Sequence, residues 1–86
     1  MIAEKTYTKP ELIKAGFDEV EMPNDNPPYF VKVTQERTTI YAGTDADNFY
    51  RVWDGRTDCA RGALKTIGQE NKLEKLADGT DENELN

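Results

Sequence analysis

The sequence predicts a single small α+β domain, and three observations lead to that prediction. The chain has 86 residues, which is enough for one domain with a limited core. Helix-start signals precede apolar residues at helical spacing, both early in the chain and in its second half. Between them, residues 29–43 alternate as β-strands do. We expect a short N-terminal helix, a two- or three-stranded antiparallel sheet, and two or three C-terminal helices on one face of that sheet.

The stretch "TYTKPELIKAGF" predicts the N-terminal helix. Thr8 can cap it, and Glu11, three residues later, can complete a capping box. Pro10 falls in the first turn, where a missing N–H group costs little. Gly16 can adopt the left-handed conformation that ends a helix.

The clearest strand pattern is "YFVKVTQERTTIYAG". Its side chains alternate between two faces and "QER" can form a turn, so we expect a β-hairpin. The preceding "FDEVEM" suits a short strand, and "PNDNPP" is expected to be a loop. Phe30 and Tyr41 lie on the sheet face that is less clearly buried. If their rings are exposed together, they form a candidate interaction patch.

The stretch "TDADNFYRVWDG" predicts a helix that covers the sheet. Thr44 or Asp45 can act as its cap, because their side-chain oxygens accept hydrogen bonds from free backbone N–H groups. Phe49, Tyr50 and Trp53 recur at helical spacing and would form the buried face of this helix.

The stretch "TDCARGALKTIG" predicts a second helix of the C-terminal half. Thr57 or Asp58 can cap it. Gly62 weakens such a helix by about 1 kcal/mol relative to alanine. We therefore expect another part of the chain to pack closely against Gly62.

A third apolar cluster, around Leu73, cannot share one straight helix face with the second helix. Leu73 lies thirteen residues after Ala60. In a helix that turns about 100° per residue, its side chain would point about 220° away from that of Ala60. The sequence thus predicts a break near Gly68, or a final helix that packs elsewhere. We assign residues 1–77 to the domain and the acidic residues 78–86 to a disordered tail.

No motif indicates catalysis, a cofactor or a metal ion. The chain has no histidine, which removes the commonest general acid–base and the histidine-activated nucleophiles. A calcium loop starting at Asp45 fails, because Phe49, Tyr50 and Arg56 occupy three of its required positions. Cys59 lies beside an apolar stripe, which favours a core residue over a reactive thiol. We expect a protein that is not an enzyme and binds no cofactor.

The sequence also predicts a cytoplasmic protein without membrane contact, present as a monomer or a weak dimer. One cysteine cannot form an internal disulfide and fits a reducing compartment. The first ten residues contain no apolar run typical of a signal peptide. No stretch approaches the ~20 apolar residues that a membrane span needs.

The charge pattern leaves two candidate binding surfaces. The net charge is −6, which disfavours nucleic acid as a partner and favours positively charged proteins or proteins that bind nucleic acid. The acidic candidates are Asp18, Glu19, Glu21 and Asp25. The basic candidates, called the basic row below, are Arg51, Arg56, Arg61 and Lys65. Either set is also typical of a merely solvated face.

Three functional hypotheses follow. The first is a small acidic protein-binding module, an accessory factor or inhibitor that occupies a partner's surface, as is frequent in phages and mobile elements. A variant is that its carboxylates imitate the phosphates of DNA and block a nucleic-acid-binding protein. The alternative is nucleic-acid binding through the basic row, with Tyr50 stacking on bases.

Overall fold

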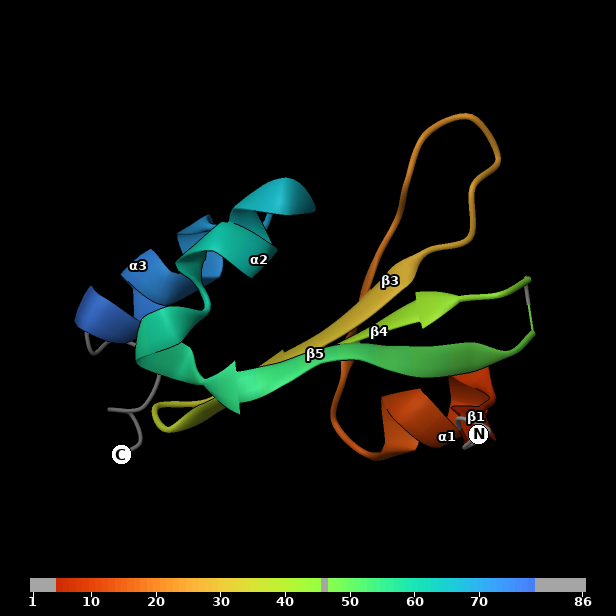
Figure 1. Ribbon diagram of the computed structural model, residues 1–86, viewed down its shortest axis with the longest axis horizontal. Helices are drawn as coiled ribbons and strands as arrows, with labels where there is room; N and C mark the ends of the chain where they lie inside the picture. Colours follow the sequence, from red (N-terminus) through yellow and green to blue (C-terminus); the bar gives the residue numbers. More distant parts are fainter. Residues whose placement is uncertain (1–4, 46, 79–86) are drawn as a thin grey trace. The chain divides into compact units, whose positions relative to one another are not determined.

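The computed structural model describes residues 5–45 and 47–78 and has an α+β fold. In chain order its elements are β1 (Thr6–Tyr7), α1 (Lys9–Lys14), β2 (Asp18–Val20), β3 (Tyr29–Val33), β4 (Arg37–Gly43), β5 (Phe49–Arg56), the 3-10 turn η1 (Thr57–Cys59), α2 (Arg61–Thr66) and α3 (Asn71–Asp78) (Figure 1). The described strands form one antiparallel sheet in the order β1-β5-β4-β3-β2.

The predicted architecture is wrong in the size of the sheet and in the order of the first elements. The described sheet has five strands instead of two or three, and strand β1 precedes the first helix. Two residues carry no recognisable alternation, so the pattern could not reveal β1. The helix itself forms as its signals indicate: Glu11 donates its backbone N–H to Thr8 Oγ1 at 3.4 Å, and Thr8 donates its own to Glu11 Oε1 at 2.8 Å.

The helix predicted to cover the sheet at Phe49–Trp53 is instead part of strand β5. Asp45, taken as a helix cap, closes the β4–β5 loop: its Oδ1 accepts hydrogen bonds from the backbone N–H of Asp47 at 2.8 Å and of Asn48 at 3.0 Å. Aspartate makes such local bonds in loops as well as at helix starts. Because aromatic and β-branched residues favour strands, "FYRVW" is more stable in the sheet.

The predicted β3–β4 hairpin, the short strand β2 and the loop between β2 and β3 are confirmed. Thr34 donates its backbone N–H to Arg37 O at 2.9 Å across the hairpin turn. In the loop, Asn24 and Asp25 both adopt the left-handed conformation, with φ of 63° and 62°. Asn and Asp adopt this conformation several-fold more often than other non-glycine residues.

The chain divides into two compact units: a first unit of Met1–Lys32 with Thr39–Asp54, and a second unit of Val33–Thr38 with Gly55–Asn86. One core cluster of the first unit consists of Leu12, Phe30 and Phe49, with Tyr7, Phe17 and Tyr41 packed against it. The rings of Phe30 and Phe49 meet edge to face with centroids 4.8 Å apart, an arrangement that aromatic pairs prefer.

The buried residues of the second unit combine apolar side chains with two hydroxyl groups. They are Ala60, Leu64, Ile67, Thr38 and Thr57. Thr57, taken as a possible helix cap, makes no cap: its Oγ1 donates to Thr34 O at 2.7 Å and lies 2.9 Å from Thr38 Oγ1. The hydroxyl of Thr57 therefore satisfies two polar groups inside this unit.

The predicted break near Gly68 is confirmed. Gly68 has φ of +74°, α2 ends two residues before it, and α3 begins three residues after it. The expectation for Gly62 is wrong, because a Cβ at that position would meet no atom within 4 Å. Of the predicted tail, Asp78 is the last residue of α3 and residues 79–86 lie outside the described residues. None of the described helices is long and apolar enough to cross a membrane.

Asp45 links the stability of the β4–β5 loop to pH. The backbone N–H of Asp47, assisted by Asn48, lowers the pKa of the Asp45 carboxyl, although desolvation opposes the shift. A group with a lowered folded pKa stabilises the fold above its unfolded pKa and loses that contribution as pH falls through the folded pKa. In an NMR titration of the Asp45 carboxyl carbon, we expect the midpoint pH in the folded protein to be lower than that of the same residue in an unfolded loop peptide. Equal midpoints would contradict the loop geometry.

Candidate functional site

The four acidic candidates lie together in sequence on β2 and on the loop that follows it, and all are exposed. We call Asp18, Glu19, Glu21 and Asp25 the acidic loop surface. Residues 15–31 contain no lysine or arginine. Glu19 Oε2 lies 3.1 Å from Lys9 Nζ of α1. This pair balances one of the four carboxylates in part, and as an ion pair near the surface it contributes only about 0–1 kcal/mol to stability.

The β2–β3 loop, the orange segment before β3 in Figure 1, is anchored on the sheet at Gly43. A Cβ at Gly43 would lie 2.7 Å from Pro27 Cβ, 2.9 Å from Asp45 O and 3.0 Å from Phe49 Cε2. Only glycine leaves room for so close an approach. The loop is thus fixed by a contact between its Pro27 ring and the backbone at the end of β4.

Two adjoining hollows lie beside this loop. The apolar hollow, about 280 Å³, is lined by Met22, Asn26, Pro27, Tyr29, Ala42 and Gly43. The acidic hollow, about 160 Å³, is lined by Glu19, Glu21, Met22, Asn26 and Pro28. Met22 and Asn26 line both. Each hollow is smaller than the roughly 300–1,000 Å³ of typical small-molecule sites, and it suits one side chain better than a cofactor.

The basic row does not form an unbalanced positive surface. Arginine–carboxylate pairs occur at Arg51–Asp54 (3.8 Å), Arg56–Asp58 (2.7 Å) and Arg61–Glu70 (2.6 Å). Arg51 lies on strand β5 in the first unit, whereas the other three members lie in the second unit. Arg61 and Lys65 are both exposed on α2, as the spacing indicates. Because a carboxylate accompanies each arginine, the row offers little net attraction for phosphates.

The aromatic candidates do not form the exposed patch that the sequence allowed. Phe30 is fully buried, and Tyr41 is half-buried with its ring edge-on to Tyr7 and Phe17. The reason is that α1 places Leu12 in the same buried cluster as Phe30. Tyr50 is half-buried in β5, opposite Thr6 of β1.

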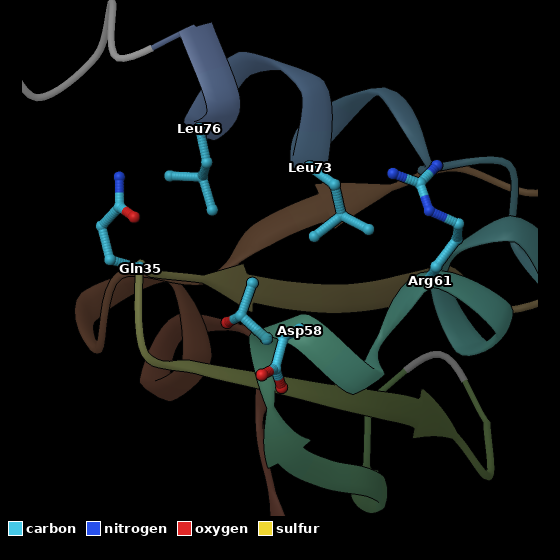
Figure 2. Close-up of a pocket in the computed structure, with 6 residues that line it drawn as sticks. Gln35, Asp58, Arg61, Leu73 and Leu76 are labelled. Carbon is cyan, nitrogen blue, oxygen red and sulfur yellow. The ribbon is translucent and has the colours of Figure 1, made fainter.

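A third hollow, about 250 Å³, lies in the second unit. Its lining residues are Gln35, Thr57, Asp58, Arg61, Leu73 and Leu76. Figure 2 shows Leu73 and Leu76 projecting from α3 toward Gln35 and Asp58. The two charged side chains in its wall are engaged in ion pairs within the unit. This hollow therefore has no charge preference that would select a partner.

Cys59 is exposed, which contradicts the core position favoured by its sequence neighbours. It ends the 3-10 turn η1, and the next residue, Ala60, takes the fully buried place. Throughout the part of the chain that the structure describes, no group of three His, Cys, Asp or Glu side chains could hold a metal ion.

Comparison with known proteins identifies no relative of this chain: no family model, no curated protein and no solved structure matches it. A functional proposal therefore rests on the residues and contacts of the chain itself.

Proposed function

We propose that this protein is a protein-binding module that uses its acidic loop surface to occupy a basic surface of a partner. One observation carries the proposal: the charges are asymmetric. Residues 15–31 hold four exposed carboxylates and no lysine or arginine, a local charge that the pair of Glu19 with Lys9 balances only in part, whereas each arginine of the basic row has a carboxylate beside it. Complementary charge speeds association and selects the partner. The role is that of an accessory factor or inhibitor.

The surroundings of the carboxylates support an interface rather than a merely solvated face. Met22, Pro27 and Pro28 are half-buried and line hollows next to Glu19 and Glu21. Protein interfaces combine an apolar centre with a polar rim, and the centre supplies most of the affinity. The loop offers both within a few residues of sequence.

A partner that itself binds nucleic acid is one form of this proposal. Such a protein carries a basic surface that accepts phosphates, and spaced carboxylates can compete for it. Inhibition by imitation of DNA is then the consequence of occupying that surface.

Charge reversal in the loop tests the proposal. We expect the double variant Glu21→Lys with Asp25→Asn to retain at least about tenfold less partner than wild type, because like charges now face each other. Asparagine is chosen at position 25 because it tolerates the positive φ found there. The measurement is affinity capture of the tagged protein from host lysate, with a series of salt washes.

The matched control is Glu36→Lys with Glu74→Gln, which makes the same change in net charge at exposed positions of the second unit. We expect this control to capture the partner as wild type does. Equal capture by the loop variant would contradict the proposal. Nucleic acid retained at low salt and released at high salt would instead support binding through the basic row.

A further inference from the structure

We propose that the partner presents a short segment in which a large apolar side chain lies beside a lysine or arginine. The apolar side chain fills the apolar hollow, and the basic side chain enters the acidic hollow. This inference rests on the proposed function and specifies the chemistry of the partner.

The two hollows adjoin each other. Met22 and Asn26 line both, so their occupants are held side by side. The larger hollow has apolar side chains in its wall, including Pro27, Tyr29 and Ala42, beside the polar side chain of Asn26. An aliphatic or aromatic side chain placed against these apolar groups loses its contact with water, which favours binding.

The smaller hollow is complementary in charge to a lysine or arginine side chain. Glu19 and Glu21 line the smaller hollow, and the neighbouring segment of chain contains no basic residue. The pair between Glu19 and Lys9 is partly exposed, with 45% of the lysine and 27% of the glutamate side chain accessible, and ion pairs near the surface contribute little to stability. A lysine or arginine of the partner can therefore take a position between the two carboxylates.

Contacts within the first unit hold the loop in place before a ligand binds. Pro27 contacts the backbone at Gly43, and Asn26 donates its backbone N–H to Pro23 O at 3.2 Å. The proline rings also fix φ at three positions of the loop. A preorganised loop loses less conformational entropy on binding, which favours a short linear segment as its ligand.

The test uses the purified full chain and a phage-displayed random heptapeptide library. We expect the enriched peptides to share a large apolar residue within one or two positions of lysine or arginine. Synthetic versions of these peptides are then titrated against wild type and variants by fluorescence anisotropy. We expect Met22→Ser and Glu21→Gln each to weaken binding about tenfold, which corresponds to about 1.4 kcal/mol.

Gly43→Ala provides a test of the anchored loop. Its new Cβ would collide with Pro27 and displace the loop, so peptide binding should be lost even though no lining side chain is shortened. Val52→Thr is the control, because Val52 is an exposed apolar residue of β5 that lines neither hollow. Circular dichroism verifies that each variant is folded. Met22→Ser, in an exterior loop, keeps the test valid if Gly43→Ala unfolds.

Several results would overturn the inference: no enriched peptide, peptides without the apolar–basic pair, or unchanged binding by Met22→Ser. Sedimentation that reveals a dimer disrupted by Met22→Ser would make a second copy the occupant, with exposed Ile13 beside Lys14 as its segment. If lysate capture depends on the loop charges but not on Met22, the proposed function stands and this inference fails. If capture is independent of the loop charges, the proposed function fails.

Discussion

Replacement of Phe49 by alanine is expected to lower the free energy of unfolding by about 3–5 kcal/mol. Phe49 is fully buried, and its ring packs against Phe30 in the core of the first unit. Small domains have a total stability of about 5–15 kcal/mol, so this one change removes a large share of it. The measurement is urea unfolding followed by far-UV circular dichroism.

Tyr50→Ala is the matched control, because Tyr50 is the next residue of β5 and is only half-buried. Successive residues of a strand point to opposite faces, so the two variants remove aromatic rings from different environments. We expect a clearly smaller loss of stability for Tyr50→Ala. Equal losses at the two positions would be inconsistent with the strand and its register.

Replacement of Thr57 by valine is expected to lower the free energy of unfolding by about 1–3 kcal/mol. Valine preserves the shape of the side chain but removes the hydroxyl that donates to Thr34 O and contacts Thr38 Oγ1. The buried hydroxyl of Thr38 then lacks this partner. A polar group that is buried without a hydrogen-bond partner destabilises the fold, because the loss of its hydration is not compensated. Thermal and urea unfolding measure the loss.

A double-mutant cycle separates the hydrogen bond from side-chain packing. Thr38→Val combined with Thr57→Val removes both hydroxyls, so we expect the double variant to lose less than the sum of the single variants. Thr39→Val is the exposed control, since its Oγ1 donates to Asp54 at 3.0 Å near solvent. Strict additivity of the Thr38 and Thr57 changes would show that their hydroxyls do not interact.

Features of the fold that depend on neighbouring residues could be predicted from the sequence. The capping box of Thr8 and Glu11 and the break at Gly68 involve contacts within a few residues. The β3–β4 turn is equally local, because Thr34 and Arg37 complete it between themselves. In each case the chemistry of the segment determines its conformation with little help from the rest of the chain.

Strand β5 could not be predicted in this way, because its signals are ambiguous until distant partners are known. Asp45 can begin a helix or close a loop with the same side-chain hydrogen bonds. The spacing of Phe49, Tyr50 and Trp53 matches a helix face, yet β5 is stabilised by its neighbours in the sheet. One of those neighbours is β1, which is too short to be visible as a pattern.

The candidate site was only partly predictable for the same reason. The exposure of Glu21 and Asp25 follows from their position between a short strand and a proline-rich loop. The hollows depend on the approach of Pro27 to Gly43, residues that lie far apart in sequence. A glycine at the end of a strand could have indicated such a close approach, but the sequence pattern predicts one at Gly62 and not at Gly43. The burial of Phe30 depends on the packing of α1 against the sheet. The sequence pattern around Phe30 does not indicate this packing.

The order β1-β5-β4-β3-β2 makes most pairings among the described strands local in sequence and leaves a single long-range pairing, between residues 6–7 and 49–50. Closing a long loop costs more entropy than closing a hairpin, so we expect the meander from β2 to β5 to form before β1 docks. Contacts made after the transition state govern how fast a protein unfolds, not how fast it folds. We therefore expect changes in the β1–β5 pairing to alter the unfolding rate, and changes within the meander to alter the folding rate.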